Sequence, residues 1–281
     1  MRVRQPVFDF SKTTARWAPF TEFAYRQNGL SFTTPPLERF LNRVLAKARS
    51  QVTGDDPASV KLRADISTFI KQESCHYTTH EQFNRAVAVG FDRIPEFEAK
   101  VEAHYARLLE KHSLPFLLAY CEGFETLGPL GAELMINSKL GYFLKGADPN
   151  VVMLFRWHAM EEFEHRTVAY DTFKRIHGGY LMRMAGFFYQ LYWFNKLAND
   201  IARYMLEEER AKMTPEEVAE SKRREKAVSK AMRKAVLRHI PKLLLPWYSP
   251  HRLPIPKGFA ALEREIDEQW MGSKQPAAAA G

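Results

Sequence analysis

The stretch from Trp157 to Asp171, WHAMEEFEHRTVAYD, constrains the fold of this chain more than any other. It contains neither proline nor glycine and is rich in helix-forming residues, so it predicts a helix. At about 100° per residue, His158, Glu162 and His165 fall within roughly a 60° arc of one helix face. Two imidazoles and one carboxylate on a single face are typical of half a metal site.

An earlier segment, QESCHYTTHEQFN, supplies the other half of such a site. Glu73 and His76 repeat the Glu-x-x-His spacing, and His80 follows one turn later. Two Glu-x-x-His helices, together with one Glu from each of two further helices, form the ligand set of di-iron and di-manganese carboxylate bundles. Any single histidine here can be explained as a hydrogen-bonded core residue, whereas the paired repeats favour metal binding.

The first of the two further acids is Glu38. Pro35 and Pro36 precede LERFLNRVLAKARSQ, and proline in a first turn is a helix-start signal. Glu38 lies beside the apolar stripe of this predicted helix, where a buried acid needs a partner. The alternative is a first-turn glutamate that is stabilised by the helix dipole alone.

The second acid is expected in FLLAYCEGFETLGPLGAELM, where Glu122 lies in the most apolar part. Glu125 is about 60° from Glu122 around the helix and Glu133 about 20°, by the helical period. Pro129 and Gly131 are expected to bend the helix before Glu133. We therefore rank Glu122 first, Glu125 second and Glu133 third.

The pattern predicts an all-α protein, a ferritin-like four-helix bundle with extra peripheral helices. The two half-sites repeat at similar spacing, with 73 − 38 = 35 residues in the first and 162 − 122 = 40 in the second, and each gap fits a helix, a turn and a helix. We expect an N-terminal arm over 1–34, a metal-binding helical domain over 35–250, and a C-terminal strap with a disordered tail over 251–281. Further helices are expected over roughly 58–89, 96–111, 150–176 and 213–239, with an aromatic-rich one from about 180.

Composition supports a folded protein in a reducing compartment. Hydrophobic residues make up 46% of the chain and aromatic residues 13%, which is enough for a core. Cys75 and Cys121 each lie next to a candidate ligand position, so we expect them reduced and the protein cytoplasmic. The first residues lack the apolar core of a signal peptide, and no uncharged apolar run approaches the ~20 residues of a membrane span.

The net charge of +8 favours anionic surfaces or substrates. A basic run extends from Lys222 to Arg238, and an aromatic cluster lies between Phe187 and Phe194. A solvated face and core packing are the usual meanings of these patterns. The alternatives are peripheral contact with a membrane or another anionic surface through 180–238, or the wall of a substrate tunnel. Nucleic acid is not expected as a partner, because no recognition motif accompanies the charge; a small-molecule substrate is expected, and a homodimer stays open.

These motifs resemble a bacterial family that is labelled predicted metal-dependent hydrolases. The resemblance covers roughly residues 30–250 and is carried by Glu38, QESCHYTTH, Glu122 and WHAMEEFEHRTVAYD. It implies a ferritin-like ligand pattern and hydrolytic activity. The order Glu, Glu-x-x-His, Glu, His-x-x-x-Glu-x-x-His is also similar to that of arylamine N-oxygenases, which implies an oxygen-activating centre with a third imidazole from His158.

We predict a dinuclear centre with Glu73 and Glu162 as bridges and Glu38 and Glu122 as terminal ligands. His76 and His165 supply one imidazole to each metal, and His158 is the additional ligand. His80 is a ligand, an orienting residue or a proton shuttle. Residues expected to orient the imidazoles are Glu161, Glu164, Asp171 and Asn84.

Carboxylates and imidazoles without thiolates suit iron or manganese better than a closed structural zinc site. We expect two iron ions, with manganese or zinc as the alternatives. The favoured function is an oxidase or oxygenase that acts on a small apolar or amine substrate. A hydrolase that uses a metal-activated water is the first alternative, and a non-catalytic metal-binding bundle is the second.

Overall fold

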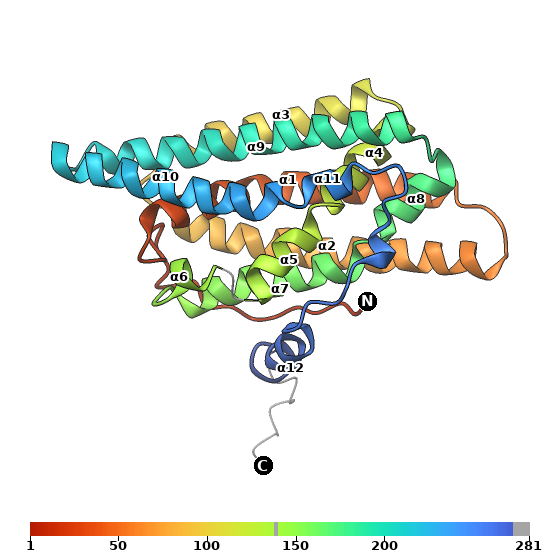
Figure 1. Cartoon of the computed structure of the whole chain (residues 1–281), viewed down its shortest axis with the longest axis horizontal. Coiled ribbons are helices and arrows are strands. Elements are labelled where there is room, and N and C mark those ends of the chain that lie inside the picture. Colours follow the sequence, from red (N-terminus) through yellow and green to blue (C-terminus); the bar gives the residue numbers. More distant parts are fainter. Residues whose placement is uncertain (138–139, 272–281) are drawn as a thin grey trace, which may run out of the picture.

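The computed structural model describes residues 1–137 and 140–271 of the chain. Within these residues every regular element is a helix, so the all-α prediction is confirmed, while the ferritin-like assignment stays a prediction. Long helices run side by side along the molecule (Figure 1). The elements are α1 Thr21–Arg49, α2 Pro57–Val87, α3 Ile94–Lys111, α4 Leu114–Glu125, α5 Gly128–Ile136, α6 Gly141–Leu144, α7 Pro149–His165, α8 Val168–Ile176, α9 Tyr180–Arg210, α10 Pro215–Leu237, α11 Ile240–Leu243, the 3-10 turn η1 Pro250–Arg252 and α12 Phe259–Gln269.

Helix α1 begins at Thr21, not at Pro35, so the predicted arm over 1–34 is too long. Proline lacks the N–H that would bond to the carbonyl four residues earlier, which for Pro35 is the carbonyl of Ser31. The helix continues because that carbonyl finds another donor, Nδ2 of Asn84 in α2, at 3.0 Å. Nearby, the hydroxyls of Thr33 and Thr34 donate to the Leu30 carbonyl at 2.7 and 3.0 Å.

Two predicted helices are each divided in two. The helix expected over 150–176 breaks after His165, where the Arg166 guanidinium donates to the Phe163 carbonyl in the last turn of α7. The helix that contains Glu122 ends at Glu125, and α5 starts anew with Pro129 in its first turn. Each break lies next to an acid or imidazole of the predicted metal site.

Glycines let the central helices approach closely. A Cβ atom at Gly186 in α9 would lie 2.3 Å from the backbone of Ala119 in α4. A Cβ atom at Gly29 in α1 would lie 2.3 Å from the carbonyl oxygen of Ala198 in α9. Any larger residue would force these helices apart, so both positions hold α9 against α1 and α4.

The two ends of the described chain meet on the outer side of α7. The extended arm before α1 runs beside α12, close to the N label in Figure 1. The backbone N–H of Val7 donates to the Trp270 carbonyl at 2.8 Å, and the ring of Phe8 contacts both Trp157 and Trp270. Within the predicted strap and tail over 251–281, residues 259–269 form the helix α12, and residues from 272 onwards lie outside the described residues. No helix in the described part of the chain has the length and apolar character to cross a membrane.

Candidate metal centre

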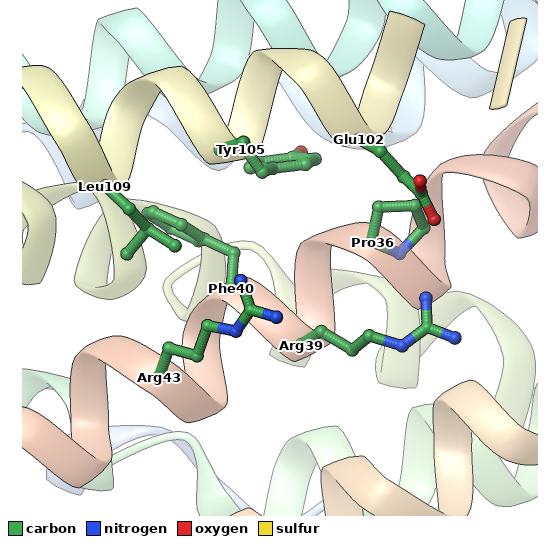
Figure 2. Close-up of a pocket in the computed structure, with 8 residues that line it drawn as sticks. Pro36, Arg39, Phe40, Arg43, Glu102, Tyr105 and Leu109 are labelled. Carbon is green, nitrogen blue, oxygen red and sulfur yellow. The ribbon is translucent and has the colours of Figure 1, made fainter. Parts of the chain in front are cut away.

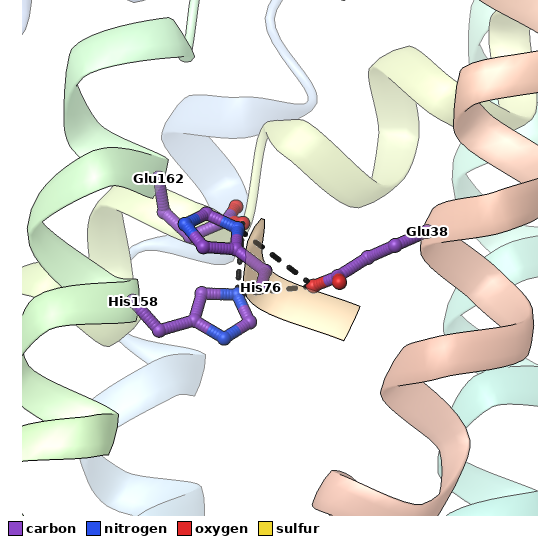
Figure 3. Close-up of side chains that lie close together, drawn as sticks. All are labelled: Glu38, His76, His158 and Glu162. Atoms are coloured by element: carbon purple, nitrogen blue, oxygen red, sulfur yellow. Dashed lines mark hydrogen bonds and ion pairs between the residues drawn. The ribbon is translucent and has the colours of Figure 1, made fainter. Parts of the chain in front are cut away.

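Six of the seven predicted ligands converge in the interior between α1, α2 and α7. Their donor atoms form two overlapping groups, each with all atoms within 4.8 Å of one another. Figure 3 shows the first group, in which Glu38 reaches from α1 towards side chains of α2 and α7. The groups are Glu38, His76, His158 and Glu162, and Glu73, His76, Glu162 and His165.

Within each set, the donor atoms lie close enough together to surround one metal ion. The Nδ1 atom of His165 lies 3.2 Å from a Glu73 oxygen, and its Nε2 atom lies 3.5 Å from Glu162. The Nδ1 atom of His76 lies 3.6 Å from Glu73 and 4.0 Å from Glu162. Glu162 and His76 belong to both groups, so they lie at the middle of the cluster.

The remaining predicted ligand, Glu122, points away from the cluster. Its carboxylate accepts hydrogen bonds from Nε of Arg183 in α9 at 2.8 Å and from the Thr126 hydroxyl at 2.9 Å. The second-ranked acid, Glu125, faces the cluster instead. Both of its oxygens are buried without a hydrogen bond, and its pKa is raised well above the usual range by burial and by the charge of Glu162. Glu133, ranked third, lies at the surface beside Arg238 and His239.

The donors of the cluster are largely unpartnered. Both carboxylate oxygens of Glu38, Glu73 and Glu125 are buried without a hydrogen bond, as are both ring nitrogens of His165 and Nδ1 of His76. Buried acceptors that lack donors are costly unless a cation binds them. The oxygen- and nitrogen-only donor set fits divalent iron, manganese or zinc.

Four acids inside the bundle have no arginine or lysine partner among the described residues. Arg183 is paired with Glu122, and Arg4 lies 3.4 Å from Glu161. The four acids left are Glu38, Glu73, Glu125 and Glu162. No arginine or lysine in the described part of the chain forms an ion pair with any of them, and two divalent cations would balance their charge. Burial, together with the nearby charge of Glu73, raises the pKa of Glu38 well above its usual range.

A chain of hydrogen bonds fixes which nitrogen of His158 faces the acids. Asn84 donates from Nδ2 to the Ser31 carbonyl, so its Oδ1 accepts from the Ser31 hydroxyl at 2.6 Å. The Ser31 oxygen then accepts from Nδ1–H of His80 at 2.7 Å, which leaves the lone pair of His80 on Nε2. That lone pair accepts from Nδ1–H of His158 at 2.7 Å. Both nitrogens of His80 are therefore engaged, and neither is left to bind a metal.

This polarity places the lone pair of His158 on Nε2, at 3.0 Å from a Glu162 oxygen and 3.4 Å from a Glu38 oxygen. A lone pair and a carboxylate oxygen are both acceptors, and they attract each other only through a cation. Burial lowers the pKa of His158, which disfavours a proton in that place. The geometry thus suits a metal ion between His158 and the two acids.

A second set of contacts orients the His76 ring through its Nε2 atom, on the side away from Glu73. Its Nε2 atom lies 3.1 Å from Glu161, whose other oxygen lies 3.4 Å from Arg4. Arg4 is fully buried in the N-terminal arm and also contacts Glu164 at 2.9 Å and Glu263 of α12 at 2.6 Å. The predicted orienting role of Glu161 agrees with this geometry. Sequence reasoning missed Arg4, because nothing near it in the chain marks it as a neighbour of the centre.

The structure bears on two other predictions, and one of them differs from it. Asp171 lies at the surface, where it contacts His251 at 2.8 Å and not an imidazole of the cluster. Cys75 and Cys121 are free thiols, as expected.

Solvent reaches the centre most closely at His158, whose side chain is 15% exposed while the other donors are nearly or fully buried. A separate cavity of about 240 Å³ lies between α1 and α3. Figure 2 shows Arg39 and Arg43 on one side of it and Tyr105 and Leu109 on the other. None of the cluster residues lines this cavity.

The fold and the cluster define an all-helical protein with a buried carboxylate and imidazole centre. Residues 2–253 match the family described as "Predicted metal-dependent hydrolase", and the chain therefore belongs to this family. No curated protein and no solved structure matches the chain. The family description agrees with hydrolysis, the first alternative function predicted from the sequence. It does not support the oxygenase function that the sequence favoured.

Proposed function

We propose that this protein is a metal-dependent hydrolase whose centre binds two divalent cations. The observation that carries the proposal is a set of four buried carboxylates near three imidazoles, in which no arginine or lysine of the described residues pairs with any of the four. The family description supports hydrolysis as the reaction. Two divalent cations bound here would polarise a carbonyl or phosphoryl oxygen and lower the pKa of a water towards neutrality.

The overlapping groups suggest a role for each donor. Glu38 and His158 would hold one cation, and Glu73 and His165 the other. Glu162, which belongs to both groups, would bridge them, and Glu125 would supply the last carboxylate in place of Glu122. Because His158 is the most exposed donor, its cation is the one that a small substrate would meet.

The other residues keep these donors in place and ready. His80 holds the lone pair of His158 towards the acids, and Glu161 holds the ring of His76 by its Nε2 atom. The rings of Trp157 and Phe69, which are fully buried, contact His76 and His165 and keep bulk water from them. Low water access strengthens the interaction between a bound cation and the carboxylates.

A second candidate is oxygen-dependent oxidation of a small apolar or amine substrate at a di-iron centre. The observation that favours it is the donor set itself, which is built on bundle helices from Glu-x-x-His repeats without thiolates. This set is also the one expected for iron. The two candidates share every ligand and differ in metal and co-reactant.

Elemental analysis of the purified protein is the first test. About two zinc or manganese ions per chain, with ester or phosphoester hydrolysis that stops on chelation and returns with metal, would support the hydrolase. About two irons per chain, with a new visible absorption band when the reduced protein meets dioxygen and no hydrolysis, would favour the oxygenase. Protein that binds neither metal under any loading condition would contradict both.

Substitutions test the ligand assignment. Glu162→Ala and His165→Ala should each lose most bound metal, because each removes a central donor. Glu164→Ala is the matched control on the same helix, since Glu164 contacts Arg4 and Gln72 and no cluster residue. Full metal content in all three variants would show that the centre lies elsewhere.

A further inference from the structure

An apolar band runs along the outer side of the first half of α9. Leu181 is 82% exposed, Tyr192 is 61% exposed, and Phe188 lies between them, half-exposed. At about 100° per residue the three fall within roughly a 40° arc of the helix. Gly186 and Arg183 lie on the opposite side, buried against α4. The band therefore points straight out of the bundle.

The segment around α11 packs against the first half of α9 and exposes a further aromatic residue. Phe187 of α9 packs with Leu243 and Tyr248 in one small cluster, and the Tyr180 hydroxyl donates to the Leu244 carbonyl at 2.7 Å. Trp247, just after α11, is nevertheless 66% exposed. An amphipathic aromatic ring that lies on the surface beside other apolar side chains is typical of a water–membrane boundary.

Helix α10, which leads into α11, has a basic face. Lys226, Lys230, Arg233 and Lys234 are exposed and fall within roughly a 100° arc, while Val228 on the other side is buried. Within residues 1–137 and 140–271, none of these four cations forms an ion pair. The next exposed residue on the same face is apolar, Leu237 at the end of the helix. Figure 1 shows α10 leading into α11 along the same side of α9.

The surface is held rigidly to the bundle. Arg183, buried in α9, donates to Glu122 of α4 at 2.8 Å and to the Leu243 carbonyl at 2.9 Å. Its guanidinium also lies over the ring of Tyr248, 4.8 Å from the centroid. Glu122, the acid that the sequence suggested as a metal ligand, thus helps Arg183 to hold α11 against α9 and α4.

We propose that this surface binds the face of an anionic phospholipid bilayer. Leu181, Phe188 and Tyr192 of the band, together with Leu237 and Trp247, would enter the boundary between headgroups and acyl chains. The unpaired cations of α10 lie beside them, where lipid phosphates and carboxylates would meet them. Apolar area together with adjacent positive charge is the combination that anchors amphipathic surfaces to anionic membranes.

Vesicle flotation tests this proposal. The full chain should bind vesicles of phosphatidylcholine with phosphatidylserine at least about tenfold more tightly than vesicles of phosphatidylcholine alone, and added salt should weaken the binding. Lys230→Gln with Lys234→Gln should weaken it by about tenfold or more, since each charge near such a surface contributes about fivefold. Leu181→Ser with Trp247→Ser should weaken binding to a similar degree while leaving the salt dependence in place.

Matched controls keep the result specific. Val89→Ser changes an exposed apolar residue just after the end of α2. Lys12→Gln combined with Lys145→Gln removes two exposed charges outside the proposed surface. Both control variants should bind vesicles as the wild type does. The proposal is overturned if the wild type ignores lipid charge, or if all variants bind alike. It is also overturned if the Leu181 and Trp247 variants instead abolish self-association of the protein in solution, because the band would then belong to an interface between two copies.

Discussion

The Nε2 atom of His80 lies 2.7 Å from Nδ1 of His158, and this contact fixes the tautomer of a candidate ligand. His80→Ala should lower metal affinity by about 10- to 100-fold, the usual range for partners of ligating histidines. His80→Gln should restore part of it, because the glutamine carbonyl can accept from Nδ1–H. Competition with a chelator measures the affinity, and equal affinity in the wild type and His80→Ala would remove the orienting role.

Ser31→Ala gives a separate view of the same chain of hydrogen bonds. It removes the acceptor for Nδ1–H of His80 without touching His158. His80 is then free to carry its proton on Nε2, where that proton would face Nδ1–H of His158. We expect a smaller loss of metal affinity than in His80→Ala, and a changed imidazole N–H signal in nitrogen NMR. An unchanged signal would contradict the assigned polarity.

The acids Glu122 and Glu125 should respond in opposite ways. Glu125→Gln removes a carboxylate that faces the cluster and should reduce bound metal. Glu122→Gln should keep the metal but destabilise the fold by about 3–5 kcal/mol, because it leaves the buried charge of Arg183 without its partner. Metal analysis beside thermal unfolding separates the two effects, and metal loss in Glu122→Gln alone would restore the original assignment.

Gly128 should be sensitive to a single added methyl group. A Cβ atom there would lie 2.7 Å from Oε2 of Glu162 and 3.3 Å from its Cβ, so Gly128→Ala pushes the central carboxylate out of place. We expect the metal affinity to fall by about tenfold or more, in line with the effect of misplaced ligands. Gly131→Ala is the control in the same helix, since a Cβ atom at Gly131 meets nothing within 4 Å. Equal metal binding by the two variants would contradict the close contact.

His104 should make the fold sensitive to acid. Burial lowers its pKa to about 4 from an ordinary value of 6.5, between the rings of Tyr189 and Trp193. The unfolded chain takes up the proton near pH 6.5 and the folded chain only near pH 4, so this residue costs stability as the pH falls through that window. His104→Phe should lose less unfolding free energy than the wild type between pH 7 and 4, as measured by denaturant titration. His112→Gln, on the neighbouring surface, is the comparison variant, and identical pH profiles for wild type and His104→Phe would refute the effect.

The sequence predicted the helices and most of the cluster because both depend on local spacing. The stretch WHAMEEFEHRTVAYD and the Glu-x-x-His repeat place their side chains on one helix face, and helix packing does the rest. The choice of Glu122 failed for a different reason. Glu125, three residues further along the same helix, is the acid that faces the cluster. Glu122 instead pairs with Arg183, which is distant in sequence.

The role of the arm could not be predicted for a similar reason. Arg4 meets Glu161 and Glu164 of α7 and Glu263 and Asp267 of α12 only after the whole chain has folded. The start of α1 was misplaced because two prolines usually begin a helix. Here Asn84, on another helix, replaces the hydrogen bond that Pro35 removes.

The position of Arg4 also sets an order of events during synthesis. Helix α12 is the last described helix to leave the ribosome, so Arg4 acquires two of its four acidic partners only after the other described helices have emerged. The helices that carry the metal donors emerge earlier, while Arg4, which contacts Glu161 beside His76, still lacks its partners on α12. We therefore expect the contacts that hold Glu161 beside His76 to be complete only after α12 has docked against the arm.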